Sequence, residues 1–300
     1  PDPVLIFGSV MALNLVVPLF ARRLHLPEII GLIAAGIVFG PHGLGILARD
    51  QTIHLLGTVG LLYIMFLAGL EIDLHQVRKN RSHAVVFGLL TFGVPLAMGI
   101  PMGIWVLGLT VPSAILLASM FSSHTLVTFP AVGKLGLTKS RSVTTVIGGT
   151  ILTDTLALLL LSVIASTTRG ELTVGFWVRL FCLMIVYVAA VLILIPLIGR
   201  KFFRDIAVDE NSEFIFVLAV ALLSSFLAHV AGLEPIIGAF LVGIALNSLI
   251  PEKSLLMTRI HFTGDIIFIP FFLLSVGMLV DLGLLLKGPG AWVISISMIA

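Results

Sequence analysis

The sequence predicts an all-α protein that crosses a membrane many times. Of its 300 residues, 59% are hydrophobic and 11% are charged, and its mean hydropathy is +1.20. A soluble domain carries about 25% charged residues, and a helix needs about 20 mostly apolar residues to cross a bilayer. Apolar stretches of about that length lie at residues 3–20, 28–47, 53–70, 84–108, 112–136, 142–166, 172–198, 212–231, 234–250 and 264–286, and an eleventh begins near residue 291.

Basic residues gather on one side of these stretches. Thirteen of the 17 Lys and Arg residues lie in the loops after spans 1, 3, 5, 7 and 9. Loops rich in Lys and Arg remain on the cytoplasmic side of a membrane. We therefore expect a multi-pass protein of the cell (inner) membrane whose N-terminus is outside.

Two pairs of spans repeat in sequence. Residues 29–37 match residues 236–244 at an offset of 207, and residues 66–74 match residues 274–282 at an offset of 208. Spans 2 and 3 therefore correspond to spans 9 and 10. An odd number of spans separates the partners, so the two halves are predicted to be inverted relative to each other, as in secondary transporters with a binding site at the midplane.

The repeat also predicts further spans beyond residue 300. Spans 1–6 should be matched by spans 8–13, yet the sequence stops in span 11. We expect the partners of spans 5 and 6 beyond residue 300 in a longer protein, where a C-terminal regulatory domain would also lie.

Asp154 lies near the middle of the apolar run Val143–Ile164. A carboxylate at mid-bilayer costs about 2.5 kcal/mol or more, even on the scale that penalises it least, so an acid there is by default a candidate functional residue. The alternative is a structural acid that bonds to Thr150 or to a neighbouring helix. We expect Asp154 to be the main functional group of the chain.

Span 5 contains a cluster of polar residues that ends in a proline. Residues 122–130 read Ser-Ser-His-Thr-Leu-Val-Thr-Phe-Pro. Pro130 removes one helix hydrogen bond and biases Phe129 away from helical geometry, and backbone groups freed at this depth are tolerated where they line a cavity. A broken helix beside a buried acid is a common form of cation site; the alternative is a kink whose hydroxyls bond back to their own helix.

The side chains near Asp154 offer oxygen atoms, which hard alkali cations prefer, and the sequence has no Cys/His cluster of the kind a transition metal needs. We expect an alkali cation and a proton to bind at Asp154, Thr153, Ser123 and Thr125. Further candidates for this site are Ser122, His124, Thr128 and Thr150.

Several motifs, taken in order, resemble one known family. They are Pro27–Gly31 with Gly36, Gly40 and Pro41; Phe66–Glu71; Ser122–Thr125; Thr153-Asp154; Gly238–Gly243; and Phe271-Phe272 with Gly277-Met278. Together they resemble the monovalent cation:proton antiporters, in the branch that includes the glutathione-gated potassium efflux proteins and related sodium/proton antiporters. The resemblance covers essentially the whole chain.

The resemblance implies an inverted-repeat antiporter fold of about 13 spans, of which about 10–11 are present here. It implies scaffold and dimerisation spans in residues 1–82 and 206–287, an ion-binding core in residues 83–170, a linking span in residues 171–205 and the start of core span 11 in residues 288–300. It further implies a homodimer, a broken span 5 that crosses beside Asp154, and alternating access by movement of the core.

The residue before Asp154 departs from the family pattern. Thr153 stands where electrogenic members carry Asp, many electroneutral members Asn and potassium efflux members Gln, so the pair does not distinguish sodium from potassium. Because one carboxylate can hold either a proton or a cation, we expect electroneutral antiport of Na⁺ or K⁺ against H⁺. The alternative within transport is a ligand-gated potassium efflux system with channel-like behaviour.

Other classes of protein fit the sequence less well. An intramembrane aspartyl protease needs two carboxylates that share a water, and the partner that the sequence offers for Asp154 is Asp265, which falls near the end of its apolar stretch. A scaffold or receptor does not require an acid at mid-membrane. We expect no enzyme activity, no cofactor and no nucleic-acid partner; the partners are the two cations and the lipid bilayer.

Overall fold

The computed structural model describes most of the chain, with gaps. The described residues are 3–23, 26–72, 81–121, 140, 142–143, 145–146, 148–150, 152–153, 156–157, 160, 164, 174–206, 209–231, 233–251, 253–281 and 283.

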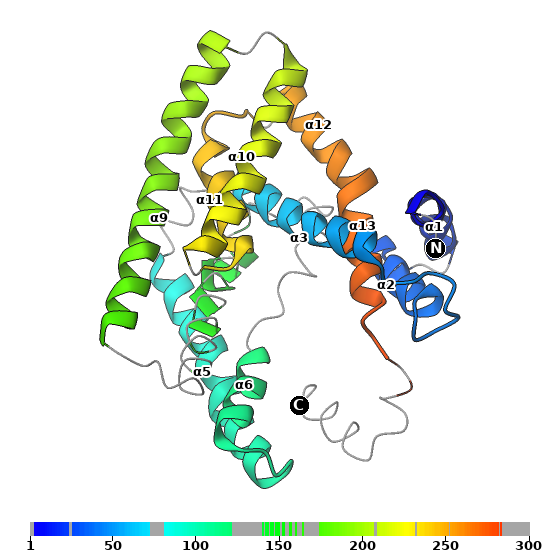
Figure 1. The fold of residues 1–300 in the computed structure, drawn as a ribbon, viewed down its shortest axis with the longest axis vertical. Coiled ribbons are helices and arrows are strands. Elements are labelled where there is room, and N and C mark those ends of the chain that lie inside the picture. Colours follow the sequence, from blue (N-terminus) through cyan, green and yellow to red (C-terminus); the bar gives the residue numbers. More distant parts are fainter. Residues whose placement is uncertain are drawn as a thin grey trace. The chain divides into compact units, whose positions relative to one another are not determined.

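Every element in this part of the chain is a helix (Figure 1). In chain order they are α1 (Pro3–Arg23), α2 (Glu28–Phe39), α3 (Gln51–Glu71), α5 (Arg81–Trp105), α6 (Val111–Met120), α9 (Val174–Lys201), η1 (Phe202–Ile206), α10 (Glu210–Val230), α11 (Pro235–Asn247), α12 (Leu255–Thr263), η2 (Gly264–Phe268) and α13 (Ile269–Gly277). The segments η1 and η2 are short π-helices.

Six helical stretches among the described residues are long and apolar enough to cross a membrane, and α2, α6 and α11 are shorter apolar helices. The long stretches are Pro3–Arg23, Gln51–Glu71, Ser82–Trp105, Cys182–Ile206, Asn211–Val230 and Leu255–Gly277. The prediction of an all-α, multi-pass membrane protein is therefore confirmed. Because the described residues yield six long spans, the count of about 13 stays a prediction.

Two predicted spans have different bounds in the structure. The second was expected at 28–47, but α2 ends at Phe39, because Gly40 and then Pro41 follow and proline cannot continue a helix. The tenth was expected at 264–286, but the continuous helix of α12, η2 and α13 runs from Leu255 to Gly277. Arg259, His261 and Asp265 reduce the hydropathy of its first half, which moved the most apolar window toward the C-terminus.

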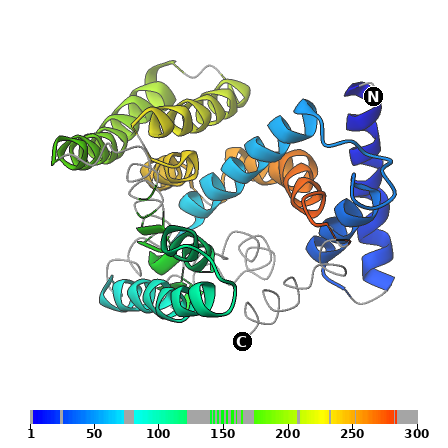
Figure 2. The same ribbon diagram turned by 60° about the horizontal axis from the view of Figure 1, so that its bottom comes forward.

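The described helices form two compact units. The first lies within residues 1–67 and 253–300 and contains α1, α2, most of α3, and the helix α12–η2–α13. In this unit α1 and α2, drawn in blue, lie beside α13, drawn in orange-red (Figure 2). The second unit, residues 68–252, contains the end of α3 together with α5, α6, α9, η1, α10 and α11.

A pair of glycines brings two helix backbones together in each unit. In the first unit, a Cβ placed on Gly36 of α2 would lie 2.9 Å from the Cα of Gly277 of α13, and the reverse distance is also 2.9 Å. In the second unit, a Cβ on Gly69 of α3 would lie 2.9 Å from the Cα of Gly243 of α11. Each crossing has no room for a side chain, which is how small residues permit close helix packing in membranes.

The helix bounds repeat with the same offset as the sequence. Helices α1 and α10 begin at residues 3 and 210 and end at residues 23 and 230, an offset of 207 at both ends. Helices α2 and α11 begin at residues 28 and 235, again 207 apart.

Equivalent positions of these helices also make equivalent contacts. Gly31 of α2 packs against Val17 of α1, and Gly238 of α11 packs against Ser224 of α10. Each residue of the second pair lies 207 positions after its counterpart in the first pair.

Polar contacts join helices within the second unit. The hydroxyl of Tyr187 on α9 donates to the carbonyl oxygen of Ser224 on α10 at 2.8 Å, and it lies 2.7 Å from the Ser224 hydroxyl. The side-chain amide of Asn247, at the end of α11, donates to the carbonyl oxygens of Leu70 (2.6 Å) and Ile72 (3.1 Å). Asn247 thereby satisfies carbonyls that the end of α3 leaves without intrahelical partners.

Candidate functional site

The structure describes two of the eight residues predicted for the cation site, Thr150 and Thr153. The other six, Asp154, Ser122, Ser123, His124, Thr125 and Thr128, lie outside the described residues. The described part of the site consists of the segment that leads to Asp154 and the helices that support it.

Thr150 and Thr153 are buried, with 8% and 1% of their surfaces exposed. The Thr153 hydroxyl donates to the carbonyl oxygen of Thr150 at 2.8 Å, and the Thr150 hydroxyl donates to the carbonyl oxygen of Val146 at 2.9 Å. A hydroxyl that gives its hydrogen to the backbone keeps its oxygen lone pairs as acceptors. Thr153 is therefore in a state compatible with coordination of a cation.

The segment before Asp154 lies directly against the backbone of α5. A Cβ on Gly88 of α5 would lie 2.7 Å from the carbonyl oxygen of Gly149 and 3.1 Å from its Cα. A Cβ on Gly148 would lie 3.1 Å from the Cβ of Ala84, which also belongs to α5. Gly149 precedes Asp154 by five residues, or about one and a half helical turns. This contact sets the position of the helix backbone that leads to the acid.

Helix α5 also supports α6, which leads to the polar stretch of span 5 (Figures 1 and 2). A Cβ on Gly99 would lie 2.8 Å from the Cβ of Ala118, and a Cβ on Gly103 would lie 2.8 Å from the Cβ of Ala114. Helix α6 ends at Met120, two residues before the polar stretch begins, and the predicted break falls outside the described residues. Thus α5 contacts both α6 and the Gly148–Gly149 segment, the two described stretches that precede candidate residues in the sequence.

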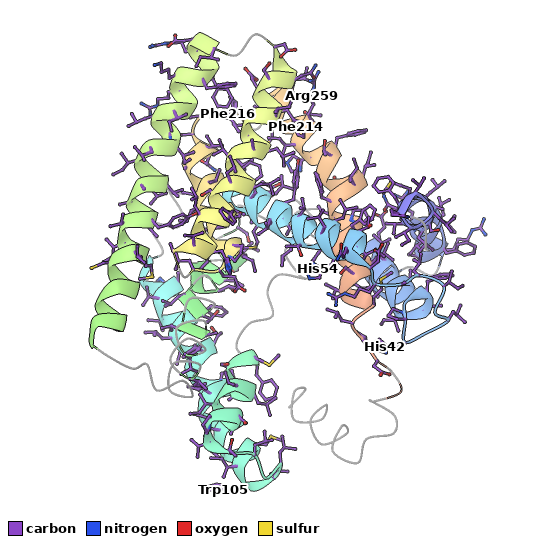
Figure 3. All side chains as sticks on the ribbon, in the orientation of Figure 1. His42, His54, Trp105, Phe214, Phe216 and Arg259 are labelled. Carbon is purple, nitrogen blue, oxygen red and sulfur yellow. The ribbon has the colours of Figure 1, made fainter. Side chains whose placement is uncertain are left out.

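Ion pairs of the first unit lie at helix ends. Arg22 at the end of α1 forms an ion pair of 2.8 Å with Glu28 at the start of α2. His42, in the loop after α2 (Figure 3), lies 3.3 Å from the carboxylate of Asp281, which comes after α13 in the chain. Such interfacial charges are solvated and cost little compared with a charge at mid-membrane.

Asp265 is the exception, because the sequence analysis placed it near the end of its apolar stretch. It is the eleventh of the 23 residues in the helix Leu255–Gly277, which is long and apolar enough to cross a membrane, so it lies near the centre of this helix instead of near an end. Its side chain is exposed. The signal was present in the sequence, since extending the helix back to the cap at Ser254 would have centred the acid.

The fold and this segment define a class: a multi-pass helical membrane protein whose helices cross at paired glycines and in which the starts of α1 and α2 recur 207 residues later, in α10 and α11. Residues 11–300 match the family described as "Sodium/hydrogen exchanger, transmembrane", and the chain belongs to that family. The resemblance inferred from the motifs is thereby confirmed.

Relatives and a solved structure agree with this assignment. The chain is 38% identical over 282 residues to the Na⁺/H⁺ antiporter NhaS5 of Synechocystis, a match that covers 94% of this chain and 40% of that protein. It is 28% identical to the probable Na⁺/H⁺ antiporter 3 of Methanocaldococcus jannaschii, covering 91% of the chain and 70% of that protein. It is 29% identical to the glutathione-regulated potassium-efflux system protein KefC of Escherichia coli, covering 92% of the chain and 44% of that protein. The sodium proton antiporter MjNhaP1 of Methanocaldococcus jannaschii has the same fold, with a TM-score of 0.72 at 19% identity, covering 99% of this chain and 75% of that one.

The chain spans less than half the length of NhaS5 and of KefC. The cargo of the full-length protein is therefore a proposal.

Proposed function

We propose that this chain is the membrane part of a monovalent cation/proton antiporter that carries its cargo at Asp154. The observation that supports this most directly is the 38% identity, over 94% of the chain, to a protein named as a Na⁺/H⁺ antiporter. An acid in the middle of an apolar run, preceded by two buried threonines, supplies the chemistry such a carrier needs.

The similarities favour sodium/proton antiport over ligand-gated potassium efflux. NhaS5 has the higher identity, and KefC is matched at 29%. Potassium as the cation stays open, because Thr153 matches none of the family's usual residues at its position. A channel-like efflux system would be favoured instead by transport that starts only when a ligand binds outside the membrane part.

Competition at one carboxylate accounts for the coupling. Asp154 on one side of the membrane exchanges a proton for a cation, the core changes its access, and the exchange reverses on the other side. The empty, charged site does not cross because an uncompensated charge is too costly in hydrocarbon. One positive charge moves in each direction, so exchange is electroneutral at a ratio of one to one. A dependence of the exchange rate on membrane potential would contradict this ratio.

The proposed architecture is an inverted repeat. The common offset of helix bounds, and the glycine crossings Gly36–Gly277 and Gly69–Gly243, support it, because the repeat maps one crossing onto the other. Residues 1–82 and 206–287 would form the scaffold of a homodimer, residues 83–170 the moving core and residues 171–205 the linking span. The N-terminus would lie outside the inner membrane, as the basic loops indicate.

The test uses the full-length protein in proteoliposomes that contain a pH-sensitive dye. Na⁺, K⁺ and Li⁺ are added in turn to wild type, to Asp154→Asn and to the control Asp50→Asn. Asp50 caps the start of α3 by accepting from the Ile53 amide at 3.0 Å, and Asn caps helices equally well, so this control should transport normally. We expect cation-driven proton movement that is lost in Asp154→Asn. Exchange in that variant at the wild-type rate would refute the carrier site, and no proton movement with any cation would refute antiport.

A further inference from the structure

Three polar side chains lie at the middle of three spans in the first unit. Asn14 is the twelfth of 21 residues in α1, Tyr63 the thirteenth of 21 in α3, and Asp265 the eleventh of 23 in the helix Leu255–Gly277. At 1.5 Å per residue, each lies about 15 Å from the ends of its helix. Polar residues at this depth are expensive in a membrane and usually mark a function.

The three meet at the π-helical segment η2. The Tyr63 hydroxyl donates to the carbonyl oxygen of Ile260 at 2.7 Å, and the Asn14 side-chain amide donates to the carbonyl oxygen of Ile266 at 3.0 Å. Tyr63 is 2% exposed, and a Cβ on Gly264 would lie 2.8 Å from its ring. Two neighbouring helices therefore hold the irregular turn with specific donors. Short π segments within α-helices occur frequently at functional sites.

The π segment separates two parts of the helix that differ in burial. After it, residues 269–275 are all buried. Within and before it, Phe262 and Ile266 are 65% and 39% exposed, and Asp265 lies on this exposed side between them. The carboxyl group thus lies near the middle of a helix that is long and apolar enough to cross a membrane, on the more exposed side of that helix.

We propose that Asp265 is a second proton-binding site of the transporter, separate from the carrier site at Asp154. A bound proton converts the carboxylate to a neutral acid, and the new O–H bond removes the charge that is costly at this depth. A single carboxylate is enough to bind a proton, whereas a metal cation needs several oxygen ligands. The ligand that we assign to this site is therefore a proton.

Several groups lie around the acid. From α3, Tyr63 packs its ring against Gly264 and donates to the carbonyl oxygen of Ile260. From α1, the packed polar group is Asn14, which carries no charge. On its own helix, His261 and Arg259 precede Asp265 by four and six residues. The proposal rests on the proposed antiport for its consequence, which is that protonation of Asp265 shapes the pH dependence of transport without carrying a proton across.

Two measurements on the full-length protein test the site, and one of them needs no transport. Infrared difference spectra of the reconstituted protein between alkaline and acid pH report the C=O stretch of each carboxyl that takes up a proton. We expect a band that is lost in Asp265→Asn, retained in Asp154→Asn and in Asp50→Asn, and shifted in its pH midpoint in Tyr63→Phe. The Tyr63→Phe variant keeps the ring packing, so it reports on the site even where Asp265→Asn fails to fold. The same band in Asp265→Asn as in wild type, or an unmoved midpoint in Tyr63→Phe, would overturn the proposal.

The second measurement is the pH profile of cation-driven exchange. We expect Asp265→Asn to transport, with its profile displaced by about one pH unit or more, while Asp265→Glu keeps a titrating profile and Asp50→Asn matches wild type. A complete loss of exchange in well-folded Asp265→Asn, or a change in its half-saturating cation concentration at every pH, would place Asp265 in the cation site and overturn the proposal. Failure of the antiport assignment would appear separately, as wild-type protein that moves no protons with any cation, and the infrared measurement would still test the site.

Discussion

The contact between Gly88 and Gly149 offers a sharp test of how the carrier segment is positioned. In Gly88→Ala, the new Cβ would lie 2.7 Å from the carbonyl oxygen of Gly149, a backbone atom that cannot rotate away. An ordinary contact needs at least 3.4 Å, so the segment leading to Asp154 must move about 0.7 Å away from α5. Forcing extra volume into a packed site costs about 1–3 kcal/mol, and the better helix propensity of Ala returns up to about 1 kcal/mol.

The expected result is a net loss of stability of about 1–2 kcal/mol, together with a larger loss of transport. Displacement of a reacting or binding group by about 1 Å can reduce a rate about 100-fold, and the backbone shift here is a large part of that distance. We therefore expect the exchange rate of Gly88→Ala to fall about tenfold or more. The rate is measured in proteoliposomes and normalised to inserted protein, and stability is measured by thermal unfolding in detergent.

A matched control lies on the same helix. A Cβ on Gly93 of α5 meets nothing within 4 Å, so Gly93→Ala should be neutral or stabilise by up to about 1 kcal/mol and transport as wild type. If Gly88→Ala exchanges cations at the wild-type rate and unfolds at the wild-type temperature, the reasoning is refuted, because the close approach of the two backbones would then have no consequence for the carrier.

Further substitutions test the packing of the two units. Gly277→Ala and Gly69→Ala should destabilise by similar amounts, about 1–3 kcal/mol, because each Cβ would lie 2.9 Å from the Cα of the partner glycine; a large effect of one with none of the other in detergent unfolding would argue against equivalent crossings. Tyr187→Phe should cost about 1 kcal/mol, since it removes the buried hydrogen bond from Tyr187 to Ser224 of α10, and unchanged unfolding would contradict this. Asn247→Ala should cost about 1–3 kcal/mol, because it removes the side-chain donor from the carbonyls of Leu70 and Ile72 at the end of α3. Asn247→Asp keeps the side-chain volume and removes the amide hydrogens, so it tests whether those hydrogens are required.

The sequence could predict the fold because hydropathy, loop charge and internal similarity act over many residues at once. The offset of 207 was visible in residues 29–37 and 236–244, and the helices that contain them begin with the same spacing. Local boundaries were less accurate. The end of α2 depends on Gly40 and Pro41, which a hydropathy window averages with the apolar residues beyond them.

The depth of Asp265 could not be predicted by the same averaging. Its helix begins after the capping Ser254 and carries Arg259 and His261 in its first half, so its most apolar window starts late. The irregular turn at Gly264 is equally hidden, because it depends on donors from Asn14 and Tyr63, which lie about 200 residues or more away in sequence. For Asp154 the case is reversed, since no other charged residue lies in the run Val143–Ile164, and the position of the acid within this run predicts its depth directly.

Two acids at mid-membrane are consistent with electroneutral exchange if they belong to parts with different movements. Asp154 is proposed to lie on the moving core, so the proton that it releases on one side was taken up on the other, and that exchange counts in the transported charge. Asp265 lies on a helix of the proposed scaffold, so a proton that it binds returns to the side it came from and adds nothing to the ratio. The pH profile and the stoichiometry should therefore respond differently to Asp265→Asn. The substitution should displace the pH profile of exchange and leave the cation-to-proton ratio at one to one. A change in stoichiometry in that variant would mean that the span of residues 255–277 moves with the cargo, and that the division into scaffold and core is drawn in the wrong place.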